Sequence, residues 1–159
     1  MRKLILFLMI CVGITNVSAQ YKTLPNIIIK DLDGNNVNIQ NIENDSNPII
    51  LNFWATWCKP CMRELENINE IYDEIENLNV RFIAISIDDA RNASKIKPLI
   101  TSKDWKYEIY KDTNGEFMRS MGVSVIPHTF VFYNGDLIWE HVGYSEGDED
   151  ILLDFMSNY

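Results

Sequence analysis

The stretch that decides the fold reads Ile49-Ile50-Leu51-Asn52-Phe53-Trp54-Ala55-Thr56-Trp57-Cys58-Lys59-Pro60-Cys61. Its first six residues form a nearly continuous apolar run of strand length, which is the pattern of a strand buried on both faces of a sheet. From residue 59 to about residue 78, apolar residues recur at spacings of three and four. This spacing predicts an amphipathic helix with its acidic side chains outward. The predicted strand is therefore followed by two cysteines at the start of the predicted helix.

Outward from this stretch, segments with strand and helix patterns alternate. Turn pairs with flanking apolar runs predict two hairpins, one over residues 27–39 around Asp33-Gly34 and one over residues 129–142 around Asn134-Gly135. Two further strands are expected over residues 80–87 and 107–110. Three further helices are expected over residues 90–101, kinked or ended by Pro98, over residues 116–121, closed by Gly122, and over residues 149–156.

This order of elements is typical of an α/β fold with a mixed central β-sheet covered by helices on both faces. At 159 residues, the chain is long enough to bury one core and too short for two comfortable domains. In such sheets, ligand chemistry takes place past the carboxyl end of a strand, and Cys58 is predicted to lie there.

The N-terminus has the pattern of a targeting segment. Met1-Arg2-Lys3 is basic, residues 4–14 are apolar, and Val17-Ser18-Ala19 is a small-residue cleavage site. We therefore expect a signal peptide over residues 1–19, a single domain over residues 20–159, and a periplasmic or otherwise exported protein. The alternatives are an uncleaved membrane anchor, for which the run is shorter than the roughly 20 residues that span a bilayer, and a lipoprotein modified at Cys11.

Cleavage would remove Cys11 and leave Cys58 and Cys61, which lie only three positions apart. A stabilising disulfide in an exported protein gains most from closing a long loop, so this spacing indicates chemistry more than a structural bridge. A zinc half-site is the other alternative. It would need two further ligands, and His128 and His141 stand in none of the usual spacings, so we expect no metal and no cofactor.

Thiol-disulfide exchange proceeds through a thiolate, which the free N–H groups and the dipole at a helix N-terminus stabilise. Cys58 is therefore the expected nucleophile, and Cys61, one turn further on, is the expected resolving thiol. Pro60 suits the first helical turn because its missing N–H costs nothing there. Trp54 and Trp57 are expected to flank the site with apolar surface.

Two other side chains are candidates for proton transfer or polarisation. Glu64 follows Cys61 by three residues and would reach the sulfurs if it turned inward, although spacing alone favours a solvated helix carboxylate. A lone histidine in a strand, such as His128, is more often half-buried than catalytic. We expect His141 at the surface.

The charge balance restricts the partners. The chain carries 23 acidic and 14 basic residues and a net charge of -9 at pH 7. This balance argues against nucleic acid or an anionic membrane surface as a partner.

The segment Asn52-Phe53-Trp54-Ala55-Thr56-Trp57-Cys58-Lys59-Pro60-Cys61 resembles the thioredoxin superfamily, and specifically its exported TlpA/ResA-like branch. Three further segments agree with that branch: the Asp33-Gly34 hairpin, residues 82–88 with their terminal aspartate pair, and Val125-Ile126-Pro127-His128-Thr129-Phe130 before Asn134-Gly135. The resemblance implies a thioredoxin-like fold with an N-terminal β-hairpin and a central αβ insertion.

The resemblance also implies roles for individual residues. Pro127 would follow a cis peptide bond and pack against the disulfide, the backbone of Ile126 would pair with extended substrate, and Trp57 would join this substrate-binding surface. Glu64 would tune the thiols, which reverses the expectation from spacing alone.

The chain departs from the family pattern at three positions. Asn52 replaces the buried aspartate of thioredoxins, so that its proton-transfer role would pass to Glu64. Glu66 replaces a proline that is common in relatives, so that the helix is expected to be less kinked. His128 replaces a common Thr, Ser or Tyr.

The implied function is a thiol-disulfide oxidoreductase that reduces disulfides in exported client proteins, as in cytochrome c maturation. Its electrons would come from a membrane thiol-disulfide donor, and we expect a monomer. The alternatives are a disulfide oxidant or isomerase, a non-catalytic thioredoxin-like binding module, and a cysteine peroxidase, for which the signature around a single reactive cysteine is missing.

Overall fold

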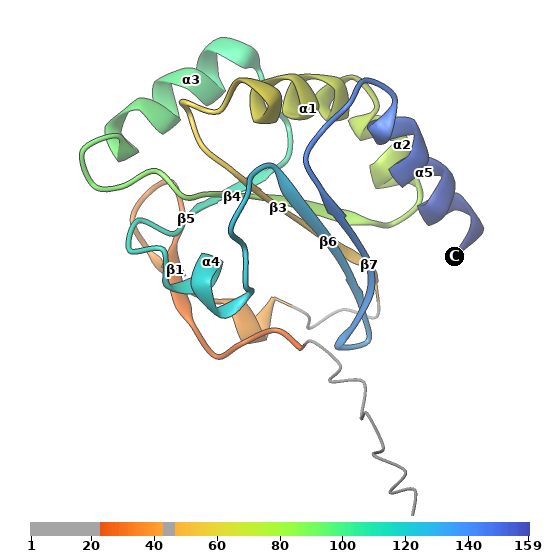
Figure 1. The fold of residues 1–159 in the computed structure, drawn as a ribbon, viewed down its shortest axis with the longest axis horizontal. Helices are drawn as coiled ribbons and strands as arrows, with labels where there is room; N and C mark the ends of the chain where they lie inside the picture. Colours follow the sequence, from red (N-terminus) through yellow and green to blue (C-terminus); the bar gives the residue numbers. More distant parts are fainter. Residues whose placement is uncertain (1–22, 43–46) are drawn as a thin grey trace, which may run out of the picture.

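The structure, a computed structural model, describes residues 23–42 and 47–159, so the predicted signal peptide lies outside the described residues. The apolar run forms strand β3 with the predicted bounds, Ile49–Trp54. In the described part of the chain, seven strands form one sheet in the order β2-β1-β5-β4-β3-β6-β7 (Figure 1). The other strands are β1 (Ile28–Lys30), β2 (Asn36–Asn38), β4 (Arg81–Ser86), β5 (Glu108–Lys111), β6 (His128–Tyr133) and β7 (Asp136–Val142).

The sheet is mixed, as predicted. Strand β3 runs parallel to β4, with Asn52 opposite Ala84, and antiparallel to β6, with Asn52 opposite Thr129. Strands β4 and β5 are parallel, whereas the β1–β2 and β6–β7 pairs are antiparallel hairpins. Asn134 and Gly135 have φ angles of 50° and 85°, as a tight hairpin turn between β6 and β7 requires.

Helices cover both faces of the sheet (Figure 1). The five α-helices of the described residues are α1 (Lys59–Glu70), α2 (Tyr72–Asn77), α3 (Ile96–Lys103), α4 (Glu116–Ser120) and α5 (Asp148–Asn158). Successive residues of β3 point to opposite faces. Trp54 accordingly belongs to the core cluster with side chains of α1, α2, α3 and α5, and Phe53 belongs to the cluster with Phe117 of α4. None of the helices described is long and apolar enough to cross a membrane.

The order of the elements confirms the two predicted additions to the core of the fold. Helix α3 and strand β5 lie between β4 and α4 in the chain and form the central αβ insertion. Strand β5 pairs with β4 on one side, and Lys111 at its end lies opposite Lys30 of β1. The N-terminal hairpin therefore extends the sheet through the inserted strand.

Two helix predictions were wrong in detail. The single helix expected over residues 59–78 is interrupted at Ile71, where φ is -98° and ψ is 9°, so that α1 ends at Glu70 and α2 begins at Tyr72. The apolar spacing continues across the interruption: Ile68 and Ile75 are both buried on the same side of the sheet. Periodicity therefore gives no sign of the break.

Pro98 neither kinks nor ends its helix. The α-helix begins at Ile96, later than expected, so Pro98 lies in the first turn, where backbone N–H groups have no partner within the helix. The helix ends instead at Asp104, which adopts the left-handed conformation with φ 51°. Gly122, after α4, also has a positive φ of 68°, as predicted.

Candidate active site

Cys58 and Cys61 form a disulfide at the carboxyl end of β3. Cys58 is the N-cap residue of α1, and its Sγ accepts a hydrogen bond from the backbone N–H of Cys61 at 3.3 Å. Cys58 is 5% exposed and Cys61 is fully buried. When the disulfide opens, the same N–H and the helix dipole favour a thiolate on Cys58, which is the more exposed of the two cysteine residues.

A loop from the other half of the chain lies against the disulfide. The Ile126–Pro127 peptide bond is cis, as the resemblance implies, and the carbonyl oxygen of Ile126 lies 4.0 Å from Cys58 Sγ. The carbonyl of Pro127 accepts a hydrogen bond from the N–H of Gly143 at 2.8 Å, which ties this loop to the end of β7. The structure thus brings Ile126 and Pro127 to the cysteines.

The two tryptophans near the cysteines have different surroundings. Trp57 is 62% exposed beside Cys58, and Val125 in the cis-proline loop is 56% exposed. Trp54 is fully buried and packs edge-on against Trp105, with ring centroids 5.2 Å apart. The prediction that Trp54 flanks the site with apolar surface was wrong, because this strand position points into the core.

A buried carboxylate holds the loop that carries Cys58. Asp88, after the end of β4, is fully buried and accepts hydrogen bonds from the Thr56 backbone N–H at 2.8 Å, the Thr56 hydroxyl at 2.7 Å and the Ser86 hydroxyl at 2.8 Å. Thr56 lies two residues before Cys58. Asp88 therefore fixes the segment between β3 and Cys58.

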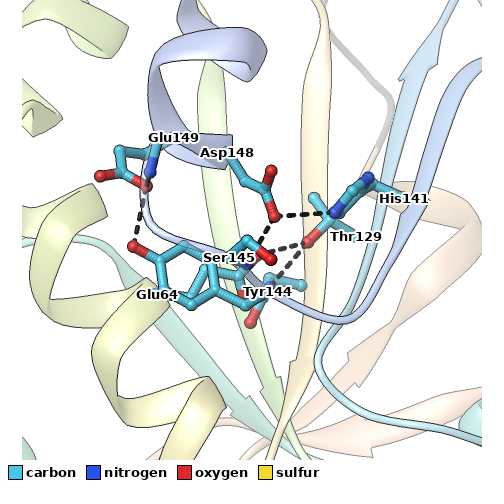
Figure 2. A network of polar contacts seen from close by, with 9 residues as sticks. Glu64, Thr129, His141, Tyr144, Ser145, Asp148 and Glu149 are labelled. Atoms are coloured by element: carbon cyan, nitrogen blue, oxygen red, sulfur yellow. Dashed lines mark hydrogen bonds and ion pairs between the residues drawn. The ribbon is translucent and has the colours of Figure 1, made fainter.

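Glu64 is buried, with 6% of its surface exposed, although spacing alone favours a solvated carboxylate. The side of α1 that carries Cys61, Leu65 and Ile68 faces the sheet, and Glu64 lies on this side. Its two carboxylate oxygens accept hydrogen bonds from Asn52 Nδ2 at 2.8 Å and from the Thr129 hydroxyl at 3.1 Å. Figure 2 shows Glu64 and Thr129 in the same polar network. The structure thus places a carboxyl group one turn beyond Cys61 inside the protein.

The surroundings of Glu64 change its acidity. Burial raises the pKa of Glu64, the hydrogen bonds from Asn52 and Thr129 oppose this effect, and the charges of Asp148 and Glu149 raise the pKa further, to about 7. A carboxyl group with this pKa accepts and releases a proton near neutral pH, which suits general acid–base chemistry beside a thiol.

The two histidines lie on different sides of the sheet. His128 is buried, stacks on Phe130 with ring centroids 4.2 Å apart, and places Nε2 2.8 Å from a carboxylate oxygen of Glu140. Adjacent residues of a strand point to opposite faces, so His128 faces away from the side on which Thr129 meets Glu64. His141, expected at the surface, is half-buried and pairs with Asp148 at 3.0 Å.

Sequence reasoning missed several polar residues around Glu64. Thr129 stands beside the cis-proline motif, which was the one local signal for it. The others come from α1, α5 and the loop before α5, and no motif marks them: Asn67, Tyr144, Asp148 and Glu149. The last three are labelled in Figure 2. Within the described ranges, no group of three or more His, Cys, Asp or Glu side chains is arranged to hold a metal ion.

Several known proteins are similar to this chain in sequence or in fold. The AhpC/TSA family matches residues 21–139. The thiol-disulfide oxidoreductase ResA of Bacillus thuringiensis subsp. konkukian (strain 97-27) is 32% identical over 123 residues, which cover 77% of this chain and 69% of that protein. An uncharacterized thioredoxin-like protein from Porphyromonas gingivalis, solved in solution, is 43% identical with a TM-score of 0.74, covering 85% of this chain and 90% of the other.

The crystal structure of StoA from Bacillus subtilis superposes with a TM-score of 0.67 over 82% of this chain and 98% of StoA. At 23% identity it supports the fold alone. The disulfide between a strand and a helix, the cis-proline loop against it and the match to ResA agree with one another. The chain belongs to the AhpC/TSA family and, within it, to the ResA-like thiol-disulfide oxidoreductases.

Proposed function

We propose that this enzyme works as a reductase, which transfers two electrons from its Cys58–Cys61 dithiol to disulfides of exported client proteins. The observation that carries this direction is the buried Glu64 carboxyl, one helical turn after Cys61. A strong oxidant needs a reduced form that is stabilised, usually through a thiolate in electropositive surroundings. A buried carboxyl group one helical turn from Cys61 opposes that stabilisation.

The proposed reaction has two exchange steps. The Cys58 thiolate attacks a client disulfide, which forms a mixed disulfide and releases one client sulfur as a thiolate. Glu64 accepts the Cys61 proton, and the Cys61 sulfur then attacks Cys58 and releases the second client sulfur. The client gains two electrons, and the enzyme is left with the Cys58–Cys61 disulfide that the structure contains.

We propose that Trp57, Ile126 and Pro127 bind the client around the disulfide. Trp57 supplies exposed apolar surface, and Ile126 presents its carbonyl near Cys58 Sγ. An extended client segment can pair with this backbone, as in other cases of strand addition.

We further propose that residues 1–19 direct export and that a membrane thiol-disulfide protein reduces the enzyme after each cycle. The basic start, the apolar run and the small-residue cleavage site support export. Export to an oxidising compartment makes a dedicated electron donor necessary, because disulfides persist there. Apocytochrome c with an oxidised cysteine pair is the client to test first.

A paired activity assay tests the direction. The mature protein, with dithiothreitol as electron donor, should accelerate reduction of a disulfide-bonded test protein such as insulin. Cys58→Ser should abolish the acceleration. If the oxidised enzyme instead forms disulfides in a reduced unfolded protein faster than it removes them from insulin, the enzyme is an oxidant. If the wild-type protein catalyses neither reaction, a binding module is favoured.

A further inference from the structure

Three polar side chains form a closed group between α1 and α5. Asn67 Nδ2 donates hydrogen bonds to the Tyr144 hydroxyl at 2.6 Å and to one carboxylate oxygen of Glu149 at 2.8 Å. The Tyr144 hydroxyl donates to the other carboxylate oxygen of Glu149 at 2.8 Å. The Gly147 N–H also reaches this oxygen, at 3.2 Å. Glu149 is thus held by neutral donors and has no cation among these partners.

This group lies next to the Glu64 pocket. Asn67 follows Glu64 by three residues, so the two side chains are neighbours on the surface of α1. Helices α1 and α5 pack against each other, and Glu149 stands in the first turn of α5. Figure 2 shows Glu64 and Glu149 in one polar region with Tyr144 and Asp148. The arrangement fixes a carboxylate beside the pocket of another carboxyl group.

Glu149 retains its negative charge in this position. Burial alone would raise the pKa of Glu149, but hydrogen bonds from its own backbone N–H, from Tyr144 and from Asn67 outweigh burial and hold this pKa below its ordinary value. The neighbouring Asp148 differs, because its carboxylate pairs with His141 at 3.0 Å and accepts the Ser145 N–H at 2.7 Å. Asp148 therefore has a histidine partner, whereas Glu149 has no such partner in the group.

We propose that Glu149 is a positioning residue of the Glu64 site: held by Asn67 and Tyr144, it keeps a negative charge against the Glu64 pocket and sets the pH range in which the enzyme exchanges disulfides. This inference rests on the proposed role of Glu64 as the proton acceptor of Cys61. It assigns to the start of α5 a function in the chemistry, although α5 contributes no residue to the disulfide or to the cis-proline loop.

The elements packed around Glu64 contribute hydrogen-bond donors, charged groups and titratable groups. Asn52 of β3 and Thr129 of β6 donate hydrogen bonds, and Asp148 and Glu149 of α5 act through their charges, both in the direction that keeps the Glu64 proton bound. The remaining titratable groups on this side are Cys61 of α1, Tyr107 before β5, Tyr144 before α5, and His141 of β7 acting through Asp148. Among the charged groups, Glu149 is the one whose hydrogen-bond partners are all neutral.

The test compares three variants by the pH dependence of disulfide-exchange rate in the full mature protein. Glu149→Gln removes the charge and keeps an acceptor for Asn67, and the midpoint of the pH profile should fall by roughly half a pH unit. Asp150→Asn is the matched control, because Asp150 is the next acidic residue in the first turn of α5 and is exposed. This control should leave the midpoint where it is in the wild type.

Glu64→Gln separates the inference from the proposed function on which it rests. If Glu64→Gln keeps the wild-type midpoint, Glu64 is not the titrating group, and the proton role proposed for Glu64 fails together with the role of Glu149. If Glu64→Gln abolishes the transition but Glu149→Gln leaves it unmoved, or Asp150→Asn moves it equally, only the role of Glu149 is overturned. A carbon-13 NMR titration of the Glu64 carboxyl in folded Glu149→Gln gives the same shift directly, independent of turnover.

Discussion

Asn52 and Glu64 meet inside the protein, where Asn52 Nδ2 donates a hydrogen bond to a Glu64 carboxylate oxygen at 2.8 Å. The same Nδ2 donates to the Thr129 hydroxyl at 2.8 Å, and that hydroxyl donates to Glu64. An amide stands at the position where the thioredoxin pattern has a buried aspartate, and Glu64 supplies the carboxyl group of this pocket. Asn52 Oδ1 is buried and has no hydrogen-bond partner among the described residues.

Asn52→Asp should move the pH profile upward. The variant puts a second carboxyl group within hydrogen-bonding distance of Glu64, and two carboxylates that share a buried site cannot both ionise readily. The midpoint for disulfide exchange should rise by about one pH unit or more. Asn77→Asp, at the exposed end of α2, adds the same charge far from the pocket and should leave the profile unchanged. If the pH profile of disulfide exchange is unchanged in Asn52→Asp, ionisation in this pocket does not affect the reaction.

The free energy of unfolding should fall as the pH rises from about 4.5 to 7. Glu64 has an ordinary pKa of 4.5 and a folded pKa of about 7, so within this range the unfolded chain has released the proton that the folded protein keeps. The stabilisation that the protonated Glu64 contributes to the folded state is complete below pH 4.5, and it is lost as the pH rises through about 7. The difference is on the order of 3 kcal/mol. Urea denaturation at several pH values measures it.

Glu64→Gln should remove this part of the pH dependence, because the glutamine side chain does not titrate. Rotation of the Asn52 amide would turn Oδ1 toward the new amide group, so the pocket can accommodate it. Glu66→Gln is the control, because Glu66 forms an ion pair with Lys103 at the surface. This variant should keep the wild-type dependence of the free energy of unfolding on pH. If the free energy of unfolding of Glu64→Gln depends on pH as strongly as that of the wild type, other groups cause the pH dependence.

Asp88→Asn should destabilise the protein by about 1–3 kcal/mol and slow disulfide exchange. The substitution removes the charge from the group that accepts the Thr56 N–H and hydroxyl and the Ser86 hydroxyl. An amide offers one acceptor oxygen in place of two, so at least one buried donor loses its partner. Thermal unfolding and the exchange rate measure the two effects. Asp136→Asn, at an exposed position, is the control, and an equal loss there would contradict the special role of Asp88.

Cys61→Ser should trap client proteins as mixed disulfides with Cys58, because the buried Cys61 is the thiol placed to release them. Non-reducing gel electrophoresis after incubation with an oxidised client detects the adduct, and Cys58→Ser should give none. Trapping through Cys61 in Cys58→Ser would reverse the assigned roles. Consumption of peroxide that survives the loss of Cys61 would indicate a peroxidase instead.

The parts of the fold that the sequence predicted best are those with a strong local pattern. Strand β3 has its predicted bounds because all six residues are buried, and burial on both faces gives a nearly continuous apolar run, which Asn52 alone interrupts. The two hairpins follow from Asp33-Gly34 and Asn134-Gly135, since few residues tolerate the required backbone. The break at Ile71 and the place of Pro98 left no periodic trace, so both were mispredicted.

The residues of the candidate site also fall into two groups, those that a local motif marks and those that only the fold brings together. Cys58, Cys61 and Pro127 belong to motifs that can be recognised within ten residues, and the structure brings them together. Glu64 appears in the sequence as one acidic residue among several on an amphipathic helix. Its burial depends on contacts with Asn52 and Thr129, which are 12 and 65 residues away along the chain. Asn67, Tyr144 and Glu149 meet only after α1 and α5 have packed, so no local pattern marks them.

The reduction potential of the Cys58–Cys61 pair tests the central claim most directly. The mature protein is equilibrated with dithiothreitol or glutathione buffers, and the fraction of disulfide is measured by thiol alkylation. A buried carboxyl group beside the dithiol predicts a reductase, with a potential near or below that of thioredoxin, around -270 mV. A value near -120 mV, which belongs to a strong oxidant, would contradict the account.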